Sequence, residues 1–101
     1  MISREIIEEL AAEELVDANA KHEPKFNSMH EAYAVLKEEL EEMQEEVKRC
    51  DAFLDLVWRC VKADDDFGVE RKLKDMKSFA VFAVQEGIQV IAMCDKAMKL
   101  Y

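Results

Sequence analysis

The chain has 101 residues, of which half are hydrophobic and 37% are charged, and its formal net charge at pH 7 is -9. With only two glycines and one proline, it lacks the turn residues that a multi-stranded sheet requires, so the composition predicts an all-α protein. The length predicts a single domain over residues 1–101. A surface this acidic repels nucleic-acid phosphates, which argues against a direct nucleic-acid binder.

The three cysteines, Cys50, Cys60 and Cys94, are odd in number and show no CxxC spacing. This pattern argues against a disulfide framework or a zinc site and favours a reducing compartment. Met1 leads into a polar segment rather than the apolar stretch of a signal peptide, and the longest apolar runs, 79–84 and 90–94, are too short to cross a bilayer. We therefore expect a cytoplasmic protein with no membrane partner.

The first predicted helix runs from about Ser3 to about Ala20. Its apolar residues recur at helical spacing and form one broad stripe, which consists of Ile6, Ile7, Leu10, Ala11, Leu15 and Ala18. Pro24 follows soon afterwards, and we expect the helix to end before it because the residue preceding a proline disfavours the α conformation.

The second predicted helix begins at Ser28, where Ser28 and Glu31 have the spacing of a capping box. Apolar residues then follow at alternating steps of four and three, at Leu36, Leu40, Met43, Val47, Cys50, Leu54, Val57 and Val61. Such a heptad seam predicts that this helix packs along another helix for most of its length.

The segment Asp64–Gly68 combines three acidic residues with a glycine and is predicted to separate the second and third helices. It lacks the spaced ligands of a calcium loop. The same alternating pattern resumes at Val69 and continues to Ala97, so we expect the two helices to form a long antiparallel hairpin. Apolar residues that lie off the seam, namely Val81, Val84, Ile88 and Ile91, predict that the bundle is completed by oligomerisation.

An antiparallel hairpin with its turn near Asp64 brings four oxygen-bearing side chains together. It places Glu39 level with Gln89 and Glu42 level with Glu86. In heptad terms Glu39 and Glu86 share one position beside the seam, and Glu42 and Gln89 share another. We therefore expect these side chains to converge on one edge of the helix pair.

Glu86 is the only charged residue between Phe79 and Cys94. A carboxylate in such an apolar stretch is costly unless it is paired, protonated or bound to a metal. Clustered oxygen ligands without His or Cys suit Mg²⁺ or Mn²⁺. The second helix is rich in glutamate, however, and the spacing alone also fits a solvated or hydrogen-bonded edge.

Two segments of the chain resemble the short MazG-like proteins that are common in phages and prophages. These are Phe26–Val35 followed by Glu38–Glu42, and later Glu86–Met93. Such proteins belong to the all-α NTP pyrophosphatase superfamily. The resemblance implies Mg²⁺-dependent hydrolysis of nucleoside triphosphates to monophosphate and pyrophosphate, by a homodimer or homotetramer.

The resemblance also assigns roles to residues. The family's ExxE motif maps to Glu39 and Glu42, preceded by Glu38, and its ExxD motif maps to Glu86 and Gln89. Glu39, Glu42, Glu86 and Gln89 are then the metal ligands, and Glu38 and Glu39 are the catalytic residues. Gln89 stands where the family has an aspartate, which removes one negative charge from the implied site.

His30 and Tyr33 lie in the first turns of the second helix, and the resemblance makes them candidates for contacts with the base or the phosphates of a substrate. A helix-start histidine and a packed tyrosine are the alternative interpretation. Two other functions remain open for the chain as a whole. One is a non-catalytic helical assembly module that keeps the fold, and the other is an acidic mimic of nucleic acid.

Overall fold

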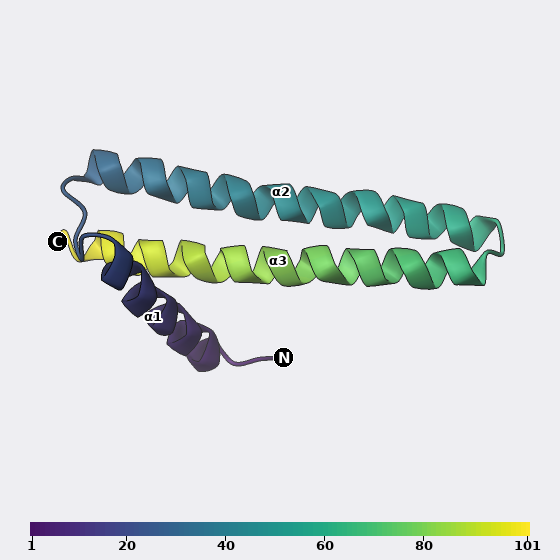
Figure 1. The fold of residues 1–101 in the computed structure, drawn as a ribbon, viewed down its shortest axis with the longest axis horizontal. Helices are drawn as coiled ribbons and strands as arrows, with labels where there is room; N and C mark the ends of the chain where they lie inside the picture. The colour runs from purple at the N-terminus through teal and green to yellow at the C-terminus, as the bar shows by residue number, and fades with distance from the viewer. The chain divides into compact units, whose positions relative to one another are not determined.

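The computed structural model describes all 101 residues and contains three helices and no strand (Figure 1). The helices are α1 (Arg4–Lys21), α2 (Met29–Lys62) and α3 (Asp66–Met98). The predicted all-α class is therefore confirmed, and α2 and α3 pack against each other as antiparallel neighbours. Contacts divide the chain into two compact units. Unit 1 comprises Met1–Glu41 and Gln85–Tyr101, and unit 2 comprises Glu42–Val84.

Helix α1 begins and ends within one residue of its predicted bounds. The Ser3 hydroxyl accepts a hydrogen bond from the Ile6 backbone N–H at 3.2 Å, as an N-cap residue does. At the other end, the backbone N–H of His22 donates to the Ala18 carbonyl at 2.9 Å, and the chain then becomes extended two residues before Pro24. The proline therefore follows the end of the helix closely, as expected.

The predicted capping box of α2 forms only in part. The Ser28 hydroxyl accepts from the Glu31 backbone N–H at 3.2 Å, which is the expected half. The Glu31 carboxylate, however, accepts from the side-chain amide of Asn27 at 2.9 Å and from its backbone N–H at 3.4 Å. Asn27 offers two donors one residue before Ser28, and the carboxylate pairs with both.

The connection between α2 and α3 is shorter than the predicted break of residues 64–68. It spans residues 63–65, and Asp64 adopts a positive φ of 52° in it. The Asp65 carboxylate accepts from the Gly68 backbone N–H at 2.9 Å and thereby caps α3. Because this cap starts the helix at Asp66, Gly68 belongs to the first turn of α3 and not to the turn between the helices.

The core of unit 1 draws on all three helices and on the segment between α1 and α2. Its members are Ala11, Leu15, Phe26, Ala32, Ala92, Met93 and Ala97. Four of these seven are alanine, which lets the helix backbones approach closely but buries little side-chain surface. Ile88, Ile91, Val35 and Leu36 pack around this core and remain partly exposed.

Only two residues of the apolar stripe predicted for α1 are buried. Ala11 and Leu15 face the core, whereas Ile6 is 46% exposed and Leu10 is 39% exposed. The predicted stripe was too broad for a helix that contacts its neighbours along a single face. Ile7 and Ala18 are half-buried, and Ile2, which precedes the helix, is exposed.

Unit 2 is a two-helix hairpin held by aromatic and small side chains. Phe53 of α2 and Phe79 of α3 lie 5.2 Å apart between ring centroids, and the Cys50 thiol donates to the Met76 carbonyl at 3.7 Å. One edge of the seam is left uncovered. Half-exposed apolar side chains follow it on both helices, and we call them the open stripe: Val47, Leu54, Val61 and Leu73, with exposures of 51, 50, 45 and 48%.

By length and composition, α3 is apolar enough to cross a membrane. One 18-residue window has a mean hydropathy of 1.2, and 17% of that window is buried. The core helix of a soluble protein passes the same test, so a single such helix is weak support for a membrane span. The expectation of a cytoplasmic protein stays a prediction.

Candidate functional site

Two of the predicted metal ligands meet in unit 1. Glu39 projects from α2 and Glu86 from α3, both are half-buried, and a carboxylate oxygen of each lies within 4.8 Å of the other. The α2 segment of unit 1 runs opposite the α3 segment, which brings together two glutamates that are 47 positions apart in the sequence. The local chain geometry thus agrees with the convergence expected for this pair.

Glu42 follows Glu39 by three residues on the uninterrupted helix α2. Residues three apart lie on the same face of an α-helix, and a carboxylate oxygen of Glu42 lies within 4.8 Å of one of Glu39. Glu42 itself is exposed. Along α2, the ExxE spacing therefore presents two carboxylates on one side of the helix, as the sequence predicted.

Gln89 has a partner that the sequence did not reveal. Its side-chain amide N–H₂ donates to the carboxylate of Glu14 on α1, and both residues are half-buried in unit 1. The amide hydrogens are therefore committed to Glu14, and the amide oxygen is the atom that Gln89 would offer a cation. The Glu14 carboxylate of α1 thus lies beside position 89, where the resemblance expects an aspartate.

Nothing in the spacing of α1 marked Glu14 in advance, because three of its neighbours within six positions are also glutamates. The one available signal was its position in the stripe that faces the core, one residue before Leu15. A charged residue at the edge of a buried face needs a polar partner, and Gln89 provides it.

A cleft of about 520 Å³ opens in unit 1 beside Glu39. It is lined by all three helices and by the loop between α1 and α2, and it combines acidic, basic and apolar groups. The lining consists of Ala18, His22, Glu23, Phe26, Glu31, Val35, Glu38, Glu39, Gln89, Met93 and Lys96. Glu38, Glu39 and Gln89 were predicted site residues, whereas His22 and Lys96 were not.

Lys96 is the one charged residue among the buried side chains, with 5% of its surface exposed. Its ammonium lies 4.6 Å from the centroid of the Phe26 ring, which is itself buried in the unit 1 core. The aromatic face offsets part of the cost of desolvating the cation. A cation held at the wall of an otherwise acidic cleft is a group that an anionic ligand could contact.

His30 and Tyr33 do not line this cleft. His30 is exposed and Tyr33 is 65% exposed, although both lie on α2 within unit 1. They project from a different side of the helix than Glu31, Val35 and Glu38, which do line it. The histidine that reaches the cleft is His22, the C-cap residue of α1.

The carboxylates of Glu39 and Glu86 fit a magnesium ion in type and spacing. Mg²⁺ takes oxygen ligands at about 2.1 Å, so that two ligands on one octahedral ion are about 3 to 4 Å apart. The observed separation of up to 4.8 Å is closed by a small side-chain rotation, which glutamate allows. The residues present therefore suit a hard divalent cation.

Comparison with protein-family models, with curated proteins and with solved structures gives no match for this chain. The MazG-like resemblance thus rests on the two segments that carry it. The function of the chain is therefore inferred from the site in unit 1 and its chemistry.

Proposed function

We propose that this chain is a Mg²⁺-dependent nucleoside triphosphate pyrophosphohydrolase of the MazG-like type. The approach of the Glu39 and Glu86 carboxylates to within 4.8 Å is the observation that carries the proposal. Two half-buried carboxylates at this distance offer a divalent cation two hard oxygen ligands from two helices. Mn²⁺ has the same ligand preference and is the alternative ion.

The cleft supports a nucleotide as the ligand. Its volume of about 520 Å³ lies within the range of about 300–1,000 Å³ that is usual for small-molecule sites. Apolar groups such as Met93 and Val35 line one part of it, and charged groups line another. A base against the apolar part and phosphates between the metal ligands and Lys96 would match each portion of the ligand to its chemistry.

The proposed reaction is attack of water on the α-phosphorus of a triphosphate, with release of pyrophosphate. A bound Mg²⁺ would neutralise phosphate charge and favour formation of hydroxide from a coordinated water. Glu38 lines the cleft one residue before Glu39 and would accept the proton of the attacking water. Lys96 would contact the phosphate oxygens and hold the leaving group in line.

We also propose that the active form is a homodimer or a homotetramer. Val47, Leu54, Val61 and Leu73 form an apolar edge about half of whose surface is exposed in unit 2. Their heptad spacing is that of a helix seam, and a second hairpin would cover them in the way that helix bundles bury such positions. This arrangement supplies the bundle that one chain leaves incomplete.

The same open stripe favours a second candidate function, a helical assembly module without turnover. Such a module would need the stripe but not the paired carboxylates. The two functions differ in what Glu86 does. In the enzyme, Glu86 is a metal ligand, and in the module it is a polar residue at the edge of a helix pair.

The deciding experiment measures pyrophosphate release from a panel of ribo- and deoxyribonucleoside triphosphates, with and without millimolar Mg²⁺. The wild type should release pyrophosphate only with the metal. Glu86→Gln removes a ligand charge and should abolish release, whereas Glu45→Gln, the same change at an exposed position of α2, should leave it unaffected.

Thermal unfolding gives an independent reading of the metal site. A cation that binds only the native state at a hundredfold excess over its dissociation constant adds about 2.7 kcal/mol of stability. The melting temperature of the wild type and of Glu45→Gln should therefore rise with Mg²⁺, and that of Glu86→Gln should not. An equal rise in all three proteins would place the metal elsewhere, and an oligomer that binds no metal would favour the assembly module.

A further inference from the structure

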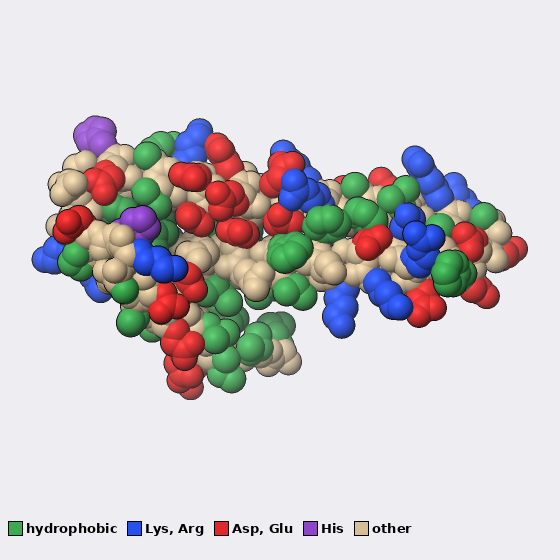
Figure 2. Space-filling view, viewed as in Figure 1, with side chains coloured by type: hydrophobic (Ala, Val, Ile, Leu, Met, Phe, Trp, Pro, Cys, Tyr) green, Lys and Arg blue, Asp and Glu red, His purple; other side chains and the backbone are tan.

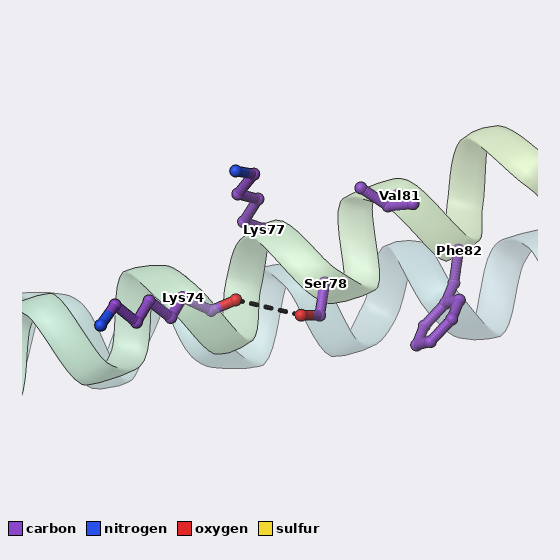
Figure 3. A pocket seen from close by; sticks show the side chains of 5 residues that line it. All are labelled: Lys74, Lys77, Ser78, Val81 and Phe82. Carbon is purple, nitrogen blue, oxygen red and sulfur yellow. Dashed lines mark hydrogen bonds between the residues drawn. The ribbon is translucent and has the colours of Figure 1, made fainter.

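Unit 2 carries a shallow groove on α3 that differs in charge from the rest of this acidic chain. It has a volume of about 370 Å³ and is lined by Lys74, Lys77, Ser78, Val81 and Phe82 (Figure 3). We call it the basic groove. The Ser78 hydroxyl donates to the Lys74 carbonyl of its own helix at 3.2 Å, so the floor between the cations is largely apolar.

The side chains of the basic groove are open to solvent. Val81 and Phe82 are each 48% exposed, and both lysines are exposed. The segment Arg71–Lys77 holds four basic residues against one acidic residue, in a chain whose net charge is -9. Lys74 forms an exposed ion pair with Glu70 at 3.4 Å, a type of contact that contributes little energy.

In unit 1, α3 already binds an acidic residue of α1. The side-chain amide of Gln89 on α3 donates to the carboxylate of Glu14 on α1. In unit 2, the apolar residues of the basic groove, Val81 and Phe82, remain about half exposed.

Helix α1 has an outer face of complementary character. Ile6 and Leu10 are 46 and 39% exposed and lie four residues apart, and Ile2, which precedes the helix, is 56% exposed. By helical register, the exposed Glu9 and Glu13 flank Ile6 and Leu10. The helix as a whole carries six acidic residues and two basic ones. Figure 2 shows acidic side chains beside hydrophobic ones along α1.

We propose that the basic groove of one chain binds α1 of a second copy of the same chain. Ile6 and Leu10 would lie against Val81 and Phe82, with Glu9 and Glu13 facing Lys74 and Lys77. The stretch from Ile6 to Glu13 and the stretch from Lys74 to Val81 each cover seven helical steps, or about 10 Å, so the two stripes match in length.

This contact differs from the one proposed for the open stripe, since it uses another face of α3 and pairs unlike surfaces. It depends on charge as well as on apolar area. Two chains that exchange α1 would form the contact twice, which doubles the surface removed from water. Helix α1 offers acidic and apolar side chains together and so matches both the lysines and the apolar residues of the basic groove. Anionic lipid headgroups would engage the lysines alone.

A charge-exchange experiment tests the proposal on the full chain. The groove-reversed variant carries Lys74→Glu and Lys77→Glu, and the α1-reversed variant carries Glu9→Lys and Glu13→Lys. In each variant alone, both faces have the same sign and the assembly should fall to about half the wild-type mass in sedimentation. In an equimolar mixture, each α1 again meets a groove of opposite sign, and the wild-type mass should return.

The matched control carries Lys48→Glu and Lys99→Glu, two exposed lysines outside the basic groove, and should keep the wild-type mass. Circular dichroism of every variant shows whether the helices are intact. Equal masses for the wild type and both reversed variants would overturn the proposal, as would a mixture that stays at the lower mass. Binding of the wild type to phosphatidylserine vesicles, lost in the groove-reversed variant without any change in mass, would assign the basic groove to a lipid surface instead.

Discussion

Because of the contact between Glu14 and Gln89, we expect the substitution Gln89→Asp to lower the stability of the chain. The family resemblance implies that Gln89→Asp restores a missing ligand. In this chain, however, the amide of Gln89 is the donor that satisfies the Glu14 carboxylate. An aspartate at position 89 has no such donor and places a second negative charge beside Glu14.

The cost of Gln89→Asp has two parts. Hydrogen bonds to charged groups contribute about 1.5–3 kcal/mol, and the lower end applies because both residues are half-buried. Repulsion between two carboxylates a few ångströms apart, at the high effective dielectric of a partly solvated site, adds about 1 kcal/mol. The total is about 2–3 kcal/mol, which for a chain of this length lowers the melting temperature by roughly 10–20 °C.

The exchange variant, Glu14→Gln combined with Gln89→Asp, should recover most of this loss. The hydrogen bond re-forms with donor and acceptor reversed, and only one carboxylate remains. It also moves the charge to α3, three residues after Glu86, where the resemblance places a ligand. The exchange variant should therefore gain more from Mg²⁺ than the wild type does.

The assay is thermal and urea unfolding of the wild type, both single variants and the exchange variant in the absence of divalent metal, at one fixed protein concentration. A double-mutant cycle should give a coupling energy of about 2 kcal/mol between the two positions. If Gln89→Asp unfolds like the wild type, or if the two changes simply add, Glu14 and Gln89 do not stabilise the chain through this contact.

Three further predictions concern other parts of the chain. A Cβ at Gly68 would lie 2.2 Å from an Asp65 carboxylate oxygen, so Gly68→Ala should displace the cap of α3 and cost about 1 kcal/mol, and the cost should not add to that of Asp65→Ala in urea unfolding. Lys96→Met keeps the buried stem but removes the ammonium, so calorimetry should show weaker Mg²⁺-dependent nucleotide binding with near-normal stability, whereas Lys96→Ala should lose both. Val47→Glu with Leu54→Glu should reduce the sedimenting mass while the exposed control Glu45→Gln does not, and an unchanged mass would exclude the open stripe as an interface.

The heptad pattern and the short connection after α2 were enough to predict the helical class and the pairing of α2 with α3, because each helix has one apolar seam and a short turn reverses the chain direction. It also predicted that Glu39 and Glu86 converge on one edge of the helix pair, since register in a hairpin follows from the position of the turn. The turn itself was predicted too long. Capping by Asp65 depends on a side-chain rotamer, and the sequence pattern does not determine rotamers.

The apolar pattern of the sequence did not predict the contacts of α1. Its stripe of six apolar residues did not indicate which half would be buried, because that depends on how a short helix is placed by a loop. For the same reason, Glu14, His22 and Lys96 were absent from the predicted site. Each reaches the candidate site or its cleft through packing between α1, the loop after it and the end of α3.

The alanine-rich core of unit 1 has a consequence for the lifetime of the protein in a cell. No large side chain is fully buried, so a single chain gains little free energy from transferring apolar surface out of water. Much of its resistance to unfolding would then come from association, which depends on how many copies are present. At low abundance the chain would unfold often and be degraded, whereas at high abundance association would keep more of it folded. Its degradation rate should therefore fall as expression rises, without any dedicated regulator.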